Sequence, residues 1–391
     1  REALYANGHS TTEEKLSKAE LLEGFAVIMK HLEATIDANK RPDGLYHAYN
    51  ILHISDDSMA VSDLTLMLEG QVAALSSGYL SAKDVAQMTK ALKASPLYVA
   101  DRNTYILYPD KELPLFWDKN NFAFEKIQNI PAVTKLMTAG CSRIFVCDDK
   151  NPAADSICHF NSDFRNVDFM RQAFAEIKAA TPDMLTPADE KAFEDVYESI
   201  FNHQSFTGRS GTFYAYEGLG SVYWHMVAKL LVAVQEYIPQ AQDSVTKQQL
   251  VEAYYSVRSG IGFNKTPAEY GAFPTDPYSH TPAGQGAKQP GMTGQVKEEI
   301  ITRWGELGIN LNKGQISFAP EYLLDKEYDD NKLSFTRFGI PFIYEKCGTK
   351  SVSVTYADGK TVTVEGNTLE GDVVKALFNR SKDITSVKVK I

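Results

Sequence analysis

The sequence has few cysteines, no basic run and no long apolar stretch, and each absence excludes a class of protein. The cysteines show no Cys-x-x-Cys spacing, so we expect no metal site. The formal net charge is −10 and no run of Lys or Arg occurs, which argues against nucleic acid or an anionic membrane surface as a partner. No stretch approaches the roughly 20 apolar residues of a membrane span. The four cysteines are Cys141, Cys147, Cys158 and Cys347.

The composition is that of a globular protein with room for two domains. The chain has 391 residues, of which 43% are apolar, and its 20 Tyr and 20 Phe fit either a large core or a groove that stacks sugars. It begins Arg-Glu-Ala-Leu, with neither an initiator Met nor a signal sequence, so the compartment is unknown. We expect it to be the C-terminal part of a larger protein or a processed chain.

The period of the apolar residues changes near residue 310. Before it, apolar residues recur at spacings of three and four residues, as in residues 12–38, which predicts helices. Residues 221–237 are apolar on nearly every side, which predicts a buried helix. After it, short alternating runs predict strands, and Asp358-Gly359 predicts a tight hairpin turn. The pattern therefore predicts a mainly α fold, with helical hairpins over residues 1–310 and a small antiparallel β-domain over 311–391.

The stretch 271–299 is crowded with Gly and Pro, which predicts a long surface loop rather than a helix or strand. A helical run follows from Gln295, with Thr293 as a suitable N-cap and Gly294 allowing close backbone approach. Unpaired N–H groups at a helix start attract anions. We interpret this loop as one that holds phosphate or a carboxylate over a sugar-binding cavity; the alternative is a structural Ω-loop.

The stretch 209–225 has the same character, an irregular Gly-rich segment followed by a buried helix. Glu217 precedes the helix and could bind sugar hydroxyls or take part in acid–base chemistry, or serve as a simple cap. The adjacent Tyr216 is a candidate substrate contact. His225, one turn into the helix, could donate to an anion held by the other loop, or could be a satisfied core histidine. In a ring of helical hairpins, alternate loops face the same end, so the two stretches can share one pocket.

The long loop and the helix after it contain further candidates. Asp276 and His280 lie in an Asp-Pro-Tyr-Ser-His run, where either could instead stabilise a turn. Gln295 opens the helix and is a candidate substrate contact. Glu298 and Glu299 lie inside the helix, where we expect at least one to be solvated.

Four segments, in this order, resemble the C-terminal half of the catalytic region of the cellobiose and chitobiose phosphorylase family. Members of that family are inverting glycoside phosphorylases with an (α/α)6 barrel. The segments are Arg41-Pro-Asp-Gly-Leu-Tyr, Leu68-Glu-Gly-Gln-Val-Ala-Ala-Leu, Glu217-Gly-Leu-Gly-Ser-Val-Tyr-Trp-His, and Pro277-Tyr-Ser-His through Thr293-Gly294.

The resemblance implies an (α/α)6-type toroid over the helical part, phosphate contacts from His225, Thr293 and Gly294, and a sugar contact from Glu217. It also implies a general acid within a Gly-Asp-Trp-Asn-Asp motif, which residues 1–39 do not contain. Fewer helical segments are present than a full barrel needs. The acid and the missing helices would then lie in an upstream domain or a partner chain that completes the toroid.

The leading hypothesis is a carbohydrate-active enzyme of the six-hairpin glycosidase type that cleaves or phosphorolyses a glycosidic bond with inversion. Glu217 and Asp276 are its candidate catalytic residues. An oligosaccharide or glycan is the expected partner, and phosphate is a co-substrate rather than a cofactor, since no cofactor is expected. The alternatives are a non-catalytic glycan-binding or scaffold protein, and a toroid for a polyprenyl or peptide substrate, although the metal-ligand spacing of such chemistry is missing.

Overall fold

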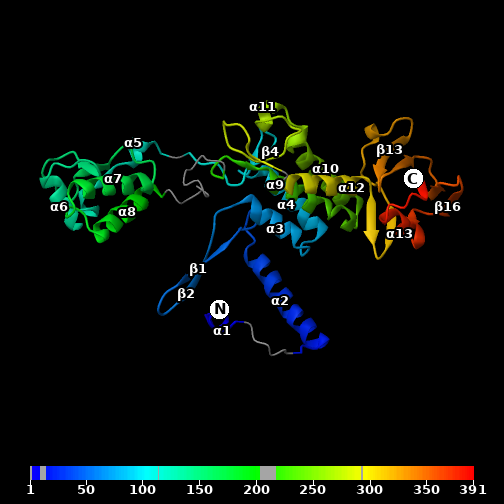
Figure 1. Ribbon diagram of the computed structural model, residues 1–391, viewed down its shortest axis with the longest axis horizontal. Coiled ribbons are helices and arrows are strands. Elements are labelled where there is room, and N and C mark those ends of the chain that lie inside the picture. Colours follow the sequence, from blue (N-terminus) through cyan, green and yellow to red (C-terminus); the bar gives the residue numbers. More distant parts are fainter. Residues whose placement is uncertain (1, 9–14, 113, 203–216, 292–293) are drawn as a thin grey trace.

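The computed structural model describes residues 2–8, 15–112, 114–202, 217–291 and 294–391. Within them, buried apolar side chains form clusters in three regions: a central helical body, a unit made by residues 122–201, and a C-terminal β-rich unit. Figure 1 shows the body in the middle of an elongated molecule, with the other two units at opposite ends.

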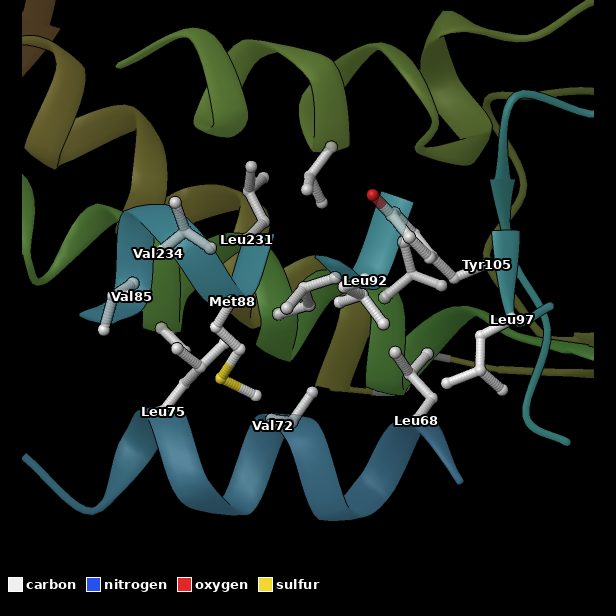
Figure 2. Close-up of a cluster of buried hydrophobic side chains, with 14 of the residues drawn as sticks. Leu68, Val72, Leu75, Val85, Met88, Leu92, Leu97, Tyr105, Leu231 and Val234 are labelled. Carbon is white, nitrogen blue, oxygen red and sulfur yellow. The ribbon is translucent and has the colours of Figure 1, made fainter. Parts of the chain in front are cut away.

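The central body is organised around helix α9 (Trp224–Gln235), which packs against α3, α10 and α12. Trp224, Val227 and Leu231 are buried, so the helix predicted to be apolar all round is confirmed as a core helix. Figure 2 shows side chains of α3, α4 and α9 meeting in one apolar cluster. The other elements of the body are α3 (Leu68–Ser76), α4 (Ala82–Ala94), β3 (Tyr98–Val99), β4 (Thr104–Tyr105), β8 (Val222–Tyr223), η3 (Ile238–Gln240), α10 (Ser244–Ser259), η4 (Gly262–Asn264), α11 (Pro267–Tyr270), β9 (Tyr278–Thr281), β10 (Lys288–Pro290) and α12 (Gly294–Glu306).

An N-terminal arm, defined as α2 and the β1–β2 hairpin, projects from one side of the body (Figure 1). Helix α2 starts with a capping box, in which Glu20 N–H donates to Ser17 Oγ and Ser17 N–H donates to the Glu20 carboxylate. The elements of this region are α1 (Glu2–Asn7), α2 (Lys18–Ala38), β1 (Asn50–Ile54) and β2 (Met59–Asp63).

The chain leaves the body after residue 112 and re-enters it near residue 217, and the unit between has its own core. Phe160, Phe193 and Tyr197 are among its buried rings, and a disulfide joins Cys147 to Cys158 across neighbouring strands. The elements are α5 (Phe116–Lys119), β5 (Phe122–Ala123), η1 (Phe124–Lys126), α6 (Pro131–Thr138), β6 (Phe145–Cys147), β7 (Ile157–Phe160), α7 (Val167–Ala180) and α8 (Pro187–Phe201).

The C-terminal unit contains a five-stranded sheet of order β13-β14-β18-β15-β16 and a smaller sheet of order β11-β12-β17. The β15–β16 hairpin turns at Asp358-Gly359 as predicted, with Gly359 at φ +83°. Its elements are β11 (Ile309–Asn312), β12 (Gln315–Phe318), η5 (Asp325–Glu327), β13 (Lys332–Arg337), β14 (Ile340–Glu345), β15 (Ser351–Tyr356), β16 (Thr361–Glu365), β17 (Thr368–Leu369), α13 (Asp372–Phe378) and β18 (Ile384–Lys390).

The predicted mainly α toroid is wrong: of the residues that the structure describes, 42% are helical and 21% are in strands, which form several small sheets. The segments read as irregular loops contain strands of two to four residues, too short to show a period-two pattern. The C-terminal unit is also not wholly antiparallel, because β14 and β18 pair in parallel. A parallel pair needs a crossover connection, and β15 to α13 provide it. The domain boundary between residues 310 and 311, which β11 spans, stays a prediction.

Candidate functional site

Strand pairing joins the two Gly-rich stretches that the sequence singled out. Strand β8 pairs antiparallel with β9, which sets Val222 opposite Thr281 and Tyr223 opposite His280. The indole N–H of Trp224 donates to Thr281 Oγ1 at 2.8 Å, and this hydroxyl donates to the carbonyl of Tyr270 at 2.7 Å. Residues 279–281 are buried, so the prediction of a purely surface loop is wrong here.

Three rings from this junction form a stack. The Tyr223 ring lies 4.5 Å from the His280 ring, centroid to centroid, with 4° between their planes. The Tyr223 ring also lies 5.7 Å from the His225 ring, at 18°. The structure therefore brings His225 and His280 together through Tyr223, which the sequence analysis did not select. The only signal in the sequence was that Tyr223 stands two residues before the candidate His225, where the Gly-rich segment meets the apolar helix.

His280 is buried, and its environment favours the neutral imidazole. Only 5% of the residue is exposed, and burial lowers its pKa to about 4, an effect that the nearby Glu217 carboxylate opposes. Its Nδ1 lies 2.8 Å from the Ser279 hydroxyl, which also contacts Gln289 Oε1 at 2.8 Å. His280 is thus neutral at pH 7 and can exchange hydrogen bonds without carrying charge.

Glu217 connects this stack to a second group of aromatic and acidic side chains. Burial is the largest cause of the raised pKa of Tyr108, and the carboxylates of Glu69 and Glu217 raise it further. Glu69 accepts a hydrogen bond from the Tyr49 hydroxyl at 2.7 Å, and that bond is the main reason the pKa of Tyr49 rises to about 12. We define the polar strip as Glu69, Tyr108, Glu217, Tyr223, His225 and His280.

Backbone contacts hold the parts of the polar strip in place. The N–H of Leu107 donates to the carbonyl of Ser221 at 2.9 Å, and the N–H of Leu68 donates to the carbonyl of Leu107 at 3.0 Å. Gly220 adopts φ +67°, and a Cβ there would lie 2.9 Å from the Cβ of Ala283. Only glycine therefore fits the close approach of the 217–220 turn to the long loop.

Charges of both signs surround His225. Burial lowers its pKa, Lys229 and Lys297 lower it further, and Glu298 opposes them. The imidazole is therefore neutral near pH 7, beside two ammonium groups that would attract an anion.

The first turns of α12 bury a polar pair. Gln295 is 4% exposed, and its Nε2 donates to Glu299 Oε1 at 3.2 Å. Its Oε1 is buried and has no hydrogen-bond partner among the described residues. Burial raises the pKa of Glu299 to about 7, although Gln295 and Arg258 oppose the shift. Glu299 is thus a carboxyl group that gains and loses its proton near neutral pH. The sequence analysis gave this residue little weight.

The remaining candidates are placed elsewhere or lie outside the described residues. Asp276 is exposed in a turn, its carbonyl accepts a hydrogen bond from Tyr270 Oη, and its carboxylate contacts the Thr275 hydroxyl. Thr293 and Tyr216 lie outside the described part of the chain, and Gly294 is the first residue of α12. Their assigned roles stay predictions.

Two hollows in the body lie apart from the predicted site residues. One of about 190 Å³ lies between α4 and α10, and one of about 270 Å³ lies beside Asp43 and Gly44. In the described ranges, no three His, Cys, Asp or Glu side chains are grouped to hold a metal ion. Nor does any described helix combine the length and apolar character needed to span a bilayer.

One family model matches part of the chain. Residues 113–204 match the model described as GH149 phosphorylase insertion domain 2. The match coincides with the unit that has its own core, set between two parts of the central body. It supports a relationship to glycoside phosphorylases and a role in carbohydrate metabolism, without pointing to the C-terminal region of cellobiose phosphorylases. No curated protein matches the chain.

Proposed function

We propose that this chain takes part in phosphorolysis of a glycosidic bond, with inversion at the anomeric carbon. The observation that carries the proposal is the match of residues 113–204 to a phosphorylase insertion domain. That unit leaves and rejoins the body beside the polar strip, where Leu107 and Ser221 are hydrogen-bonded. The side chains of the strip are of the kinds that bind sugars and anions.

In this proposal the phosphate lies near His225 and the start of α12. Lys229 and Lys297 supply positive charge, and neutral His225 can donate an N–H to a phosphate oxygen. The backbone N–H groups from Gly294 onward would add donors, as the first turn of a helix leaves them unpaired. Thr293, which lies outside the described residues, would complete this end, and the amide Nε2 of Gln295 would donate to the phosphate if it left Glu299 Oε1.

The sugar lies along the rest of the polar strip. Glu217 and His280 would bind its hydroxyl groups, together with Tyr216, which lies outside the described residues. One phosphate oxygen attacks the anomeric carbon, the bond to the leaving oxygen breaks, and a carboxylic acid protonates that oxygen. Glu217 is our candidate for this acid, because its carboxylate acts on the pKa values of both Tyr108 and His280 in the polar strip, whereas Asp276 is exposed. The alternative is an acid from an upstream domain or partner chain.

The test compares release of sugar 1-phosphate from a panel of oligosaccharides with and without inorganic phosphate. We expect turnover only with phosphate, loss of most of it in Glu217→Gln, and a raised KM for phosphate in His225→Phe. Asp43→Asn, beside the separate hollow, is the matched control. Turnover that does not need phosphate would refute phosphorolysis.

Calorimetry with the same saccharides distinguishes an enzyme from a binding protein. Saccharide binding without turnover would favour the glycan-binding alternative, or a chain whose acid comes from another polypeptide. Absence of both binding and turnover over the whole panel would refute the sugar site itself.

A further inference from the structure

The turn between β3 and β4, residues 100–103, carries a cation whose contacts lead to the polar strip. The Arg102 guanidinium donates from Nη1 to the carbonyl of Gly220 at 3.1 Å. Arg102 is partly buried, and burial lowers its pKa, although Asp101 and Asp110 oppose the shift. In the described part of the chain neither carboxylate forms an ion pair with the guanidinium, and its hydrogen bond goes to a backbone carbonyl instead.

The carbonyl that Arg102 contacts belongs to the turn next to Glu217. The N–H of Ser221 donates to the carbonyl of Gly218 at 3.3 Å, and Gly220 has φ +67°, as a type II turn requires at its third residue. A hydrogen bond to the Gly220 carbonyl fixes the plane of the peptide group that follows it. It thereby fixes the direction of the turn, and Glu217 stands immediately before that turn.

A buried lysine holds the backbone on which Arg102 stands. Lys265 is 7% exposed, and its ammonium group donates to the carbonyl of Arg102 and, at 3.2 Å, to the carbonyl of Asn103. Burial lowers the pKa of Lys265, Glu269 opposes the shift, and Arg102 lowers it further. An ammonium group is strongly hydrated, so its burial is costly unless hydrogen bonds compensate. Among the described residues, backbone carbonyls provide those bonds.

Further contacts fix the turn around Asn103, which has φ +43°. Its side chain accepts a hydrogen bond from the Tyr98 hydroxyl at 2.8 Å and donates to the Ser259 hydroxyl at 3.1 Å. Its carbonyl lies against Gly260, where a Cβ would stand 2.3 Å from the carbonyl oxygen. A backbone held from several sides moves little, so Arg102 extends from a preorganised base.

We propose that Arg102 and Lys265 are positioning residues for Glu217, an inference that rests on the proposed function. Lys265 fixes the backbone of Arg102, Arg102 fixes the carbonyl of Gly220, and this carbonyl sets the turn that presents Glu217 to the ligand. Charged donors suit this role, because their hydrogen bonds are stronger than those of neutral donors. Neither cation has to touch sugar or phosphate.

The first test is the kinetics of phosphorolysis in Arg102→Met and Arg102→Lys. A displacement of about 1 Å in a catalytic group can lower the rate about 100-fold. We expect kcat of Arg102→Met to fall about 10- to 100-fold while KM for phosphate stays near the parent value. Arg102→Lys keeps a charged donor and should recover most of kcat. A raised KM for phosphate with unchanged kcat would show that Arg102 binds the anion itself, and would overturn the proposal.

Lys265→Met tests the order of these contacts, because Met fills a similar volume without the charge. If Lys265 acts through Arg102, the variant with both changes should lose no more kcat than Arg102→Met alone. Losses that multiply would show two independent effects and refute this order. Lys135→Met is the matched control, since it removes a lysine bond of 3.0 Å to the carbonyl of Asp183 in the unit made by residues 122–201. It should leave kcat unchanged.

Hydrogen exchange tests the same contacts without turnover. In Arg102→Met the amides of residues 217–223 should exchange faster than in the parent chain, because the Ser221 N–H closes a turn that has lost its support. Lys135→Met should leave this segment unchanged, and circular dichroism checks that each variant is folded. A parent chain without phosphate-dependent turnover would refute the proposed function, and exchange would then decide by itself whether Arg102 fixes the turn. Unchanged exchange of residues 217–223 in Arg102→Met would overturn the inference.

Discussion

The imidazole of His280 lies parallel to the phenol ring of Tyr223, with 4.5 Å between centroids. The two residues are paired across β8 and β9, so one strand register fixes both rings. His225, two residues after Tyr223, also stacks on the Tyr223 ring. The contact between Tyr223 and His280 joins the two Gly-rich stretches, so substitution of its residues tests the candidate site directly.

Removing the titratable ring of His280 should change how stability depends on pH. The unfolded imidazole has a pKa of 6.5 and the folded one about 4, so between these values the unfolded state binds more protons and stability falls as pH falls. His280→Phe keeps a ring in the stack but cannot bind the proton. We expect the parent chain to lose about 2 kcal/mol more than the variant between pH 7 and 4, allowing for solvent screening. Urea unfolding across that range checks this, and parallel curves would contradict it.

Glu299 should make stability depend on pH in the opposite direction from His280. Its folded pKa of about 7 is above the ordinary 4.5, so its contribution is present at low pH and lost as pH rises from 4.5 through 7. Glu299→Gln keeps the shape without the charge, and should be more stable than the parent at pH 8 by about 2 kcal/mol, given partial exposure. At pH 4 the two should be equal. A variant that is less stable at pH 8 would show that the ionised carboxylate is needed there.

A buried ion cluster should make Glu306 one of the more sensitive positions. Its carboxylate is inaccessible to solvent, contacts Arg258 at 2.6 Å and Arg303 at 2.7 Å, and accepts the Tyr254 hydroxyl at 2.7 Å. Glu306→Gln leaves the Arg258 guanidinium without this counter-charge and Arg303 with Glu327 alone, and we expect a loss of about 3 kcal/mol in the free energy of unfolding. In the control, Glu321→Gln breaks the more exposed pair with Lys247 and should cost less than about 1 kcal/mol. Equal losses of stability in Glu306→Gln and Glu321→Gln would refute the role of burial.

Two helical glycines should respond to alanine in opposite ways. At Gly305 in α12, a Cβ would lie within 2.5 Å of the Gln235 amide, which donates to the Thr302 carbonyl. Gly305→Ala should therefore push α12 from α9 and cost about 1–3 kcal/mol. At Gly24 in α2 nothing lies within 4 Å, so Gly24→Ala should stabilise the helix by up to about 1 kcal/mol. Thermal unfolding and helical circular dichroism measure both effects.

The sequence predicted what depends on local pattern. The residues of α9 are apolar on nearly every side, which predicted a buried helix, and Asp358-Gly359 predicted a turn. The sequence could not show β8 or β9. Strands of two and four residues are too short for an alternating pattern, and only their pairing with each other defines them. The sequence analysis also missed the β1–β2 hairpin, and it predicted strands after residue 310 without the parallel pairing of β14 and β18, because a strand's own sequence does not specify its partner or their relative direction.

The sequence by itself determined the kinds of side chain at the candidate site, their order along the chain and the net charge. Only the tertiary structure decided which of them meet. His225 and His280 belong to one stack because of a strand register, and Glu299 titrates near neutral pH because of burial. Both effects depend on neighbours distant in sequence, and no local pattern encodes them. Helix α2 is the reverse case, since its apolar residues at spacings of three and four predicted the helix but only the fold shows that none of them is buried.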